Sequence, residues 1–247
     1  MKNKTLYVNG CSFAYGMGVN ISERETWKER FSATLSTKIG YEDLNKSVPG
    51  SCNQRIARRT ALDLISLKPD IAIIVWSDPA RFEFVQQHPD RYRFGEDCEQ
   101  VRPLSVYNYP RNKRHAFLDY YSHIASSHTD VFNTLYAMLS TKMIADSLKI
   151  PCIQIPFKNA FHRELLKVSG FDNQEYLDSL NQFIDILSSD DLIFGINDEV
   201  SFDSISGCDR DKSLLSGLPD QGGHPGKAAH DIMSNWLYKF ITDKNLL

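Results

Sequence analysis

Short apolar runs bounded by turn residues occur at four places along the chain. They are residues 5–10 (TLYVNG), 70–77 (DIAIIVWS), 151–157 (PCIQIPF) and 191–196 (DLIFGI). These runs are too continuous for half-exposed antiparallel strands, so they are predicted to be strands buried on both faces of a parallel sheet. A less apolar segment, residues 41–48, lies between the first two and is a further candidate strand.

Segments with the apolar spacing of helices separate these runs. The first covers residues 23–39, with apolar side chains four residues apart, and it is followed by Gly40, which suits a helix C-terminus. The other predicted helices cover residues 53–67, 130–150, 173–187 and 227–244. Strands that alternate with helices predict right-handed crossovers and a three-layer α/β/α sandwich with a central, mostly parallel sheet.

Residues 79–129 depart from this alternation. They contain many aromatic and charged residues with little periodicity, and a connection of this length is far longer than an ordinary loop. We therefore expect one domain over residues 1–247, with an insertion or lid at about 79–129.

The composition narrows the class of protein. The net charge of −3 provides no general attraction to nucleic acid or to anionic membranes, and no apolar stretch reaches the roughly 18 residues of a membrane span. The five cysteines are scattered without a CxxC pair, which indicates reduced thiols rather than disulfides or a zinc site. With no apolar signal-peptide core near residue 1, we expect a cytoplasmic protein without a metal or other cofactor.

Two possible nucleophiles, Cys11 and Ser12, follow the first predicted strand in a glycine turn. Ligands of parallel sheets bind beyond the carboxyl ends of the strands, so a serine here can direct its hydroxyl and backbone N–H at a substrate. The same turn can also be a purely structural bend. Only one strand precedes it, which argues against the nucleophile elbow of α/β-hydrolases. Neither a P-loop nor a dinucleotide-binding fingerprint is present.

A histidine near the other end of the chain is a candidate partner for this serine. His224 lies in a Gly- and Pro-rich loop within residues 218–237, directly before the last predicted helix. A lone histidine is commonly structural or simply solvated. Its place before the terminal helix is what makes His224 a candidate general base.

With a serine after the first strand and a histidine before the last helix, the chain resembles the SGNH (GDSL-type) hydrolases. The family motif G-D-S-x-x-x-G corresponds to residues 10–16, with Cys11 where the family has aspartate. The family's glycine after the second strand corresponds to Gly50. The motif G-x-N-D corresponds to residues 75–78, with Ser77 in place of the asparagine.

The last motif of the family, D-x-x-H, corresponds to residues 221–224. Gln221 stands in the aspartate's place, and Asp220 comes one residue earlier. The resemblance implies a flavodoxin-like fold and an esterase in which Ser12 attacks an acyl carbonyl and His224 removes its proton. Asp220, or Gln221 through its amide, would then orient the histidine.

The same resemblance implies an oxyanion hole made by the backbone N–H groups of Ser12 and Gly50. The family's third donor is an asparagine amide, for which the Ser77 hydroxyl and the Asn53 amide are the candidates here. Loss of one good donor lowers kcat by ~10²–10³-fold, so these departures bear on activity more than on the fold. Cys11 is interpreted as a packing residue, because in this family the residue before the serine turns back under the sheet.

The leading hypothesis is a hydrolase of an O-acyl or acetyl ester on a polar substrate such as a glycan. Arg81 is a candidate to hold a substrate anion, or to pair with a neighbouring carboxylate. Trp76 is a candidate to stack on a sugar or base, or to pack in the core. The alternative hypothesis is a catalytically altered protein of this fold that binds a carbohydrate, nucleotide or protein. The basic run at 111–115 is too small a feature to favour nucleic-acid binding.

Overall fold

A four-stranded parallel sheet in the order β2-β1-β3-β6 forms the centre of the structure. The computed structural model describes residues 3–19, 26–79, 81–85, 101–104, 127–156, 174–196, 200–206 and 224–247. The strands of this sheet are β1 (Thr5–Gly10), β2 (Glu42–Asn45), β3 (Ile71–Trp76) and β6 (Cys152–Pro156). Because every pairing is parallel, the carboxyl ends of all four strands meet at one edge. The predicted fold class is confirmed.

The predicted strand at 191–196 is present only as a single parallel bridge between Ile193 and Gln154 of β6. The reason lies at Gly195, whose φ of +78° takes the chain out of the extended conformation. A Cβ at this glycine would lie 2.3 Å from the Pro156 side chain. The chain therefore leaves the extended conformation at Gly195, beside the last residue of β6.

The longer helices follow the predicted segments with one break, and the short helices α1 and α8 were not predicted. Their bounds are α1 (Ser12–Tyr15), α2 (Thr26–Glu29), α3 (Phe31–Ile39), α4 (Asn53–Leu67), α6 (Ser127–Leu148), α7 (Gln174–Ser188), α8 (Phe202–Ser206) and α10 (Lys227–Asp243). The predicted helix over 23–39 divides at Arg30, whose backbone is extended (φ −68°, ψ 154°). The Arg30 Nη2 lies 2.9 Å from Asp43 Oδ2 of β2, so an ion pair to the sheet accompanies the interruption.

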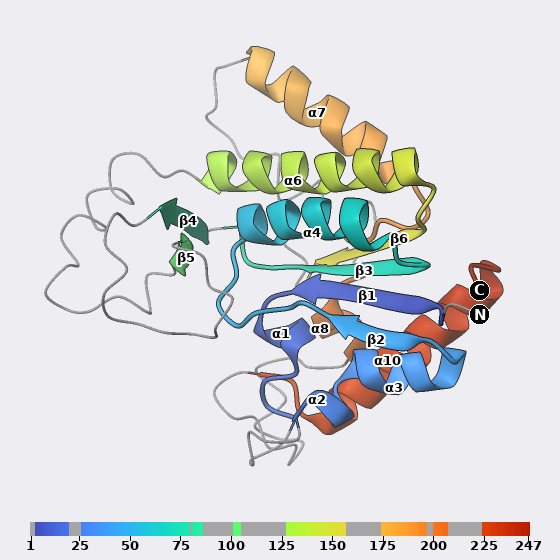
Figure 1. The fold of residues 1–247 in the computed structure, drawn as a ribbon. Coiled ribbons are helices and arrows are strands. Elements are labelled where there is room, and N and C mark those ends of the chain that lie inside the picture. Colours follow the sequence, from blue (N-terminus) through green and yellow to red (C-terminus); the bar gives the residue numbers. More distant parts are fainter. Residues whose placement is uncertain are drawn as a thin grey trace, which may run out of the picture.

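Helices cover both faces of the sheet, as Figure 1 shows: α4, α6 and α7 lie on one side, and α3 and α10 on the other. Alternate residues along each strand enter separate cores. On β3, Ile71, Ile73 and Val75 pack with residues of α3 and α10, whereas Ala72, Ile74 and Trp76 pack with residues of α4, α6 and α7. Both faces of the strands are thus buried, which is why their sequences are continuously apolar.

Part of the predicted insertion contains a separate small sheet. Strands β4 (Phe82–Val85) and β5 (Val101–Leu104) pair antiparallel to each other, apart from the central sheet. Residues 80, 86–100 and 105–126 lie outside the described part of the chain. A lid role for 79–129, and a single domain over the whole chain, remain predictions. None of the described helices is long and apolar enough to cross a membrane.

Candidate active site

The turn between β1 and α1 places Ser12 at the carboxyl edge of the sheet. Ser12 is the first residue of α1 and is 4% exposed. A Cβ at Gly10 would lie 2.7 Å from the Val75 carbonyl oxygen and 2.8 Å from the Ala14 Cβ. Because a Cβ does not fit at Gly10, this sharp return of the chain requires glycine there.

Asn9, the residue before this glycine, fixes the end of β1. Its side-chain oxygen accepts a hydrogen bond from the Gly10 N–H (2.9 Å). Its Nδ2 donates to the Ile56 carbonyl (3.2 Å) and to Thr60 Oγ1 (3.0 Å) of α4. A fully buried amide with these partners holds the serine turn against α4.

Cys11, the rival nucleophile, is buried at 1% exposure within the core cluster that faces α3 and α10. The same cluster includes Phe13, Phe202 and Met233. This environment fits the predicted packing role, and it withholds the thiol from a substrate at the edge of the sheet.

The loop that contains Gly50 runs beside the carboxyl end of β1. The Lys46 N–H donates to the Val8 carbonyl (2.8 Å), and the Val48 N–H donates to the Gly10 carbonyl (3.1 Å). Gly50 then adopts a φ of +78°, a conformation that favours glycine. The structure therefore brings the Gly50 segment next to the turn that begins at Ser12.

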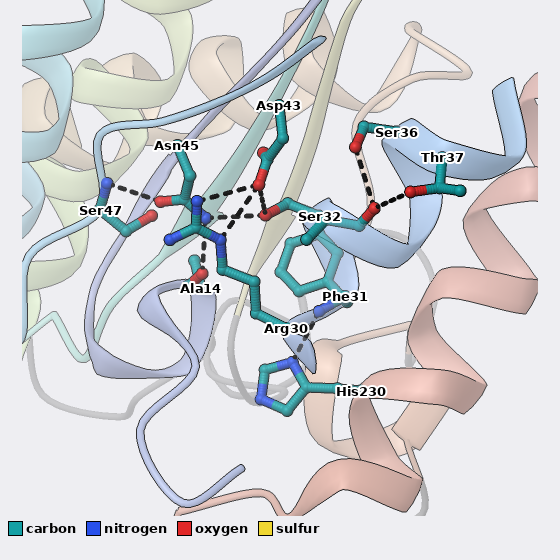
Figure 2. Close-up of polar contacts among 11 residues, drawn as sticks. Ala14, Arg30, Phe31, Ser32, Ser36, Thr37, Asp43, Asn45, Ser47 and His230 are labelled. Carbon is teal, nitrogen blue, oxygen red and sulfur yellow. Dashed lines mark hydrogen bonds and ion pairs between the residues drawn. The ribbon is translucent and has the colours of Figure 1, made fainter. Parts of the chain in front are cut away.

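Asn45 links these two segments, a role that the sequence analysis missed. Figure 2 shows its side chain between them: Nδ2 donates to the Ala14 carbonyl of α1 (2.9 Å), and Oδ1 accepts from the Ser47 N–H (2.9 Å). Nδ2 also lies 3.0 Å from Ser32 Oγ, which donates to Asp43. The only sequence signal was a polar residue at the end of a predicted strand.

His224 lies beside the serine turn, although more than 200 residues separate the two in the chain. Its ring centroid is 5.7 Å from that of Phe13, the residue after Ser12. A Cβ at Gly18 would lie 3.0 Å from both the His224 Cβ and the Pro225 carbonyl oxygen. No hydrogen bond joins the Ser12 hydroxyl to His224 within the described residues. Asp220 and Gln221 fall outside those residues.

Ser77 and Asn53 face each other across the ends of β3 and α4. The Ser77 N–H donates to Asn53 Oδ1 (2.7 Å), and Asn53 Nδ2 donates to the Ser77 carbonyl (3.1 Å). The second amide hydrogen of Asn53 is used by Thr134 Oγ1 of α6, at 2.9 Å. Asn53 therefore holds helices and sheet together, and we exclude it as an oxyanion donor because both of its amide hydrogens are engaged.

Trp76 is completely buried, and this corrects the prediction of a stacking surface at that position. Its Nε1 donates to Gln154 Oε1 of β6 (2.9 Å), and Gln154 in turn donates to the Met138 carbonyl of α6 (3.2 Å). The indole points into the core under α6, where no ligand can contact it.

Arg81 reaches back to the end of β3. Its Nη1 donates to Ser77 Oγ (2.9 Å), and its backbone N–H donates to the Asp78 carbonyl (3.2 Å). Nearby, burial first and the charge of Asp78 second raise the pKa of the Asp130 carboxyl to about 6. The carboxyl edge of β3 thus carries a guanidinium, a hydroxyl and two carboxyl groups.

Comparison with known proteins shows that solved structures share the fold of this chain. No family profile matches the sequence, and no curated protein matches it. Among solved structures, a protein assigned to the G-D-S-L lipolytic family from Desulfitobacterium hafniense aligns with a TM-score of 0.52 at 14% identity, over 96% of this chain and 99% of that one. An acetylxylan esterase from Geobacillus stearothermophilus aligns with a TM-score of 0.51 at 14% identity (98% and 96% of the chains). The esterase EstA from Pseudoalteromonas sp. aligns with a TM-score of 0.50 at 14% identity, over 98% of each chain.

Proposed function

Because the chain has the fold of the SGNH hydrolases, we propose that it is a serine hydrolase that cleaves an ester. Ser12 attacks the acyl carbonyl, and His224 accepts its proton and later returns it to the leaving alcohol. The backbone N–H groups of Ser12 and Gly50 bind the oxyanion of the tetrahedral intermediate. Asp220 is proposed to orient His224 through the second ring nitrogen.

One observation carries this proposal more than any other. The segment at 224–225 lies against Phe13, within the helix that starts at Ser12, and against Gly18, shortly after that helix ends. The Ser12–His224 hydrogen bond itself is not formed, but catalytic bonds of this kind are often long without substrate and shorten in the complex.

We further propose that the ester is an O-acyl or acetyl group on a polar substrate such as a glycan. An acetylxylan esterase is among the proteins that share the fold. The polar groups at the carboxyl edge of β3 support a polar substrate as well. They belong to Ser77, Asp78, Arg81 and Asp130.

The test combines covalent labelling with turnover. The purified protein is incubated with a fluorophosphonate probe, and hydrolysis of p-nitrophenyl acetate is measured. We expect labelling at Ser12 that is lost in Ser12→Ala, together with a fall in kcat of at least ~10³-fold. Cys11→Ala is the matched control, because it changes the adjacent residue and should keep both labelling and turnover. His224→Gln should slow labelling while leaving the fold intact.

A second candidate function is binding without turnover, by a catalytically altered protein of the same fold. The observation that favours it is the missing hydrogen bond between Ser12 and His224. Absence of labelling and of hydrolysis over pH 6 to 9, in a protein with a cooperative unfolding transition, would favour this reading. Binding to acetylated and deacetylated oligosaccharides would then be compared by calorimetry.

A further inference from the structure

Three consecutive residues at the start of α3 bind this helix to the sheet and to α10 (Figure 2). Arg30, the residue before the helix, donates from Nε (3.2 Å) and Nη2 (2.9 Å) to Asp43 Oδ2 of β2. The backbone N–H of Phe31 donates to His230 Nδ1 of α10 at 3.2 Å. The hydroxyl of Ser32 donates to the same Asp43 oxygen at 3.2 Å. We call Arg30, Phe31 and Ser32 the α3 junction.

The ion pair of this junction fixes the direction of the Ser32 hydroxyl. The guanidinium of Arg30 holds Asp43 Oδ2, and that oxygen takes the only hydroxyl hydrogen of Ser32. Ser32 Oγ can therefore only accept from its other neighbour, Asn45 Nδ2, at 3.0 Å. This keeps the amide nitrogen of Asn45 on the side from which it also donates to the Ala14 carbonyl of α1, at 2.9 Å.

The short helix α1 depends on such an external contact. It has four residues and begins at Ser12, and a single helical turn is unfavourable by itself because nucleation fixes many dihedral angles for few hydrogen bonds. The Ala14 carbonyl lies in the last part of this turn and is bound by Asn45. The position of Ser12 therefore depends on a side chain that the α3 junction orients.

The other side of the junction leads to the candidate general base. His230 lies in the first turn of α10, shortly after His224, and it is completely buried. The Phe31 N–H is one of the first amide groups of α3, which have no partner inside their own helix, so the His230 ring supplies the acceptor that this buried group needs. The bond ties the start of α10 to the start of α3.

We propose that the α3 junction positions Ser12 and His224 relative to each other. This inference rests on the proposed esterase function. One arm of the junction runs through Asn45 to α1, and the other runs through His230 to α10. Apolar packing between the same elements is non-directional, so the hydrogen bonds of the junction supply the direction. Its members are positioning residues, since they act through α1 and α10.

The experiment measures kcat and KM for p-nitrophenyl acetate, and the rate of fluorophosphonate labelling, in variants of both arms. Ser32→Ala removes the hydroxyl that orients Asn45, and His230→Phe removes the acceptor of the Phe31 N–H. We expect each to lower kcat and the labelling rate by roughly 10-fold with little change in KM, because misplacing a reacting group by about 1 Å can cost ~10²-fold. The double variant should be little slower than the slower single variant, because either change already uncouples α1 from α10.

Two pairs of variants separate hydrogen bonding from packing. His230→Asn keeps an acceptor near Nδ1 but loses the ring, whereas His230→Phe keeps the ring volume but loses the acceptor. The proposal expects His230→Asn to have the higher kcat, and the opposite order would overturn it by assigning His230 to packing alone. Arg30→Lys should likewise have a higher kcat than Arg30→Met, because its ammonium group can still pair with Asp43.

Lys142→Met is the matched control for Arg30→Met. Lys142 and Asp190 form an ion pair whose side chains are each 19% exposed, close to the 12% and 13% of the Arg30–Asp43 pair. It lies beside the amino end of β6, at the opposite edge of the sheet from Ser12. Lys142→Met should lower the thermal stability and leave kcat unchanged. An equal fall of kcat in both variants would overturn the inference, because the loss would then follow from general destabilisation.

Labelling of Ser12 in the wild type reports on the proposed function independently. If the wild type is neither labelled nor active, the function and this inference fail together. If the wild type is labelled, the inference alone is overturned by unchanged kcat in Ser32→Ala and His230→Phe, or by losses that multiply in the double variant. Thermal unfolding confirms that each variant is folded at the assay temperature. If the double variant does not fold, the comparison of Arg30→Met with Arg30→Lys and Lys142→Met decides.

Discussion

Replacement of His230 should reduce the loss of folding stability that this protein undergoes as the pH falls. His230 lies in the first turn of α10 and is completely buried. Its Nδ1 accepts a hydrogen bond from the N–H of Phe31, the first residue of α3, at 3.2 Å (Figure 2). Its ring stacks on Phe31 at 6.0 Å and meets Phe202 edge-on at 5.7 Å. The neutral ring therefore links α10 to the start of α3.

Protonation would break this link. Protonated Nδ1 could no longer accept the Phe31 N–H, and the buried Nε2 has no hydrogen-bond partner among the described residues that would stabilise the charge. Burial, opposed by Asp231 and aided by Arg30, lowers the pKa of His230 to about 3. The unfolded chain keeps a histidine pKa of about 6.5, so it binds the proton more readily than the folded protein does. Stability from His230 is therefore present above pH 6.5 and is lost as the pH falls toward 3.

These pKa values correspond to a loss of about 2 kcal/mol between pH 8 and pH 5. The assay is urea unfolding at both pH values for the wild type, His230→Asn and His230→Phe. Asparagine keeps an acceptor near the Nδ1 position, and phenylalanine keeps the ring volume. Both variants lose some stability at pH 8, but neither can titrate at this position. We expect each to lose about 2 kcal/mol less than the wild type on going to pH 5.

The comparison with the wild type isolates His230, because both variants keep every other titrating group. Asp130 is one of these, and its raised pKa makes its own contribution change with pH in the opposite direction. If both variants keep the full pH dependence of the wild type, the reasoning is refuted, and the ring is either solvated or protonated without cost. Because His224 precedes the same helix, the proposed esterase activity of the wild type should also be lost reversibly at the pH where α10 begins to detach.

Two further predictions use matched changes. Gly18→Ala should lower kcat by at least ~10-fold, because its new Cβ would displace residues 224–225 in addition to straining a φ of +92°. Gly40→Ala is the control: it strains a similar φ of +72°, but its new Cβ would meet no atom within 4 Å. It should therefore reduce only the stability, by roughly 1 kcal/mol. Equal activity in the two variants would contradict the contact with His224. Asp130→Asn mimics the protonated form of a carboxyl whose pKa is raised to about 6. Protonation of Asp130 stabilises the folded protein increasingly as the pH falls from about 6 toward the unfolded value near 3.8. The variant should therefore gain more stability over the wild type at pH 8 than at pH 4.5 in urea unfolding, and a gain that is the same at both pH values would argue against the raised pKa.

The strands and the place of the site could be predicted because they depend on local patterns. A continuous apolar run such as 71–76 has no solvent-facing side, so it must be buried on both faces of a sheet. The carboxyl ends of parallel strands share one edge, so the residues after three successive strands had to gather there. Ser12, Gly50 and Ser77 all lie at that edge, as expected from their order in the chain.

The roles of individual side chains at that edge depended on partners far away in sequence. Asn53 is excluded as an oxyanion donor by Thr134, 81 residues further along. Trp76 is buried because Gln154 and α6 lie on its side of β3. His230 has a structural role because its Nδ1 accepts a hydrogen bond from the N–H of Phe31, 199 residues earlier, at the start of α3.

The amino-acid sequence by itself determined the four strands of the central sheet, most of the long helices, and the edge of the sheet at which the chemistry-bearing residues collect. Only the tertiary structure decided which polar groups at that edge remain free to act. The physical reason is that apolar periodicity is a property of neighbouring residues, whereas the satisfaction of a buried hydrogen-bonding group depends on whichever helix covers it. The hydrogen bond from Arg81 to Ser77 is such a decision, since it engages two side chains whose roles the sequence left open.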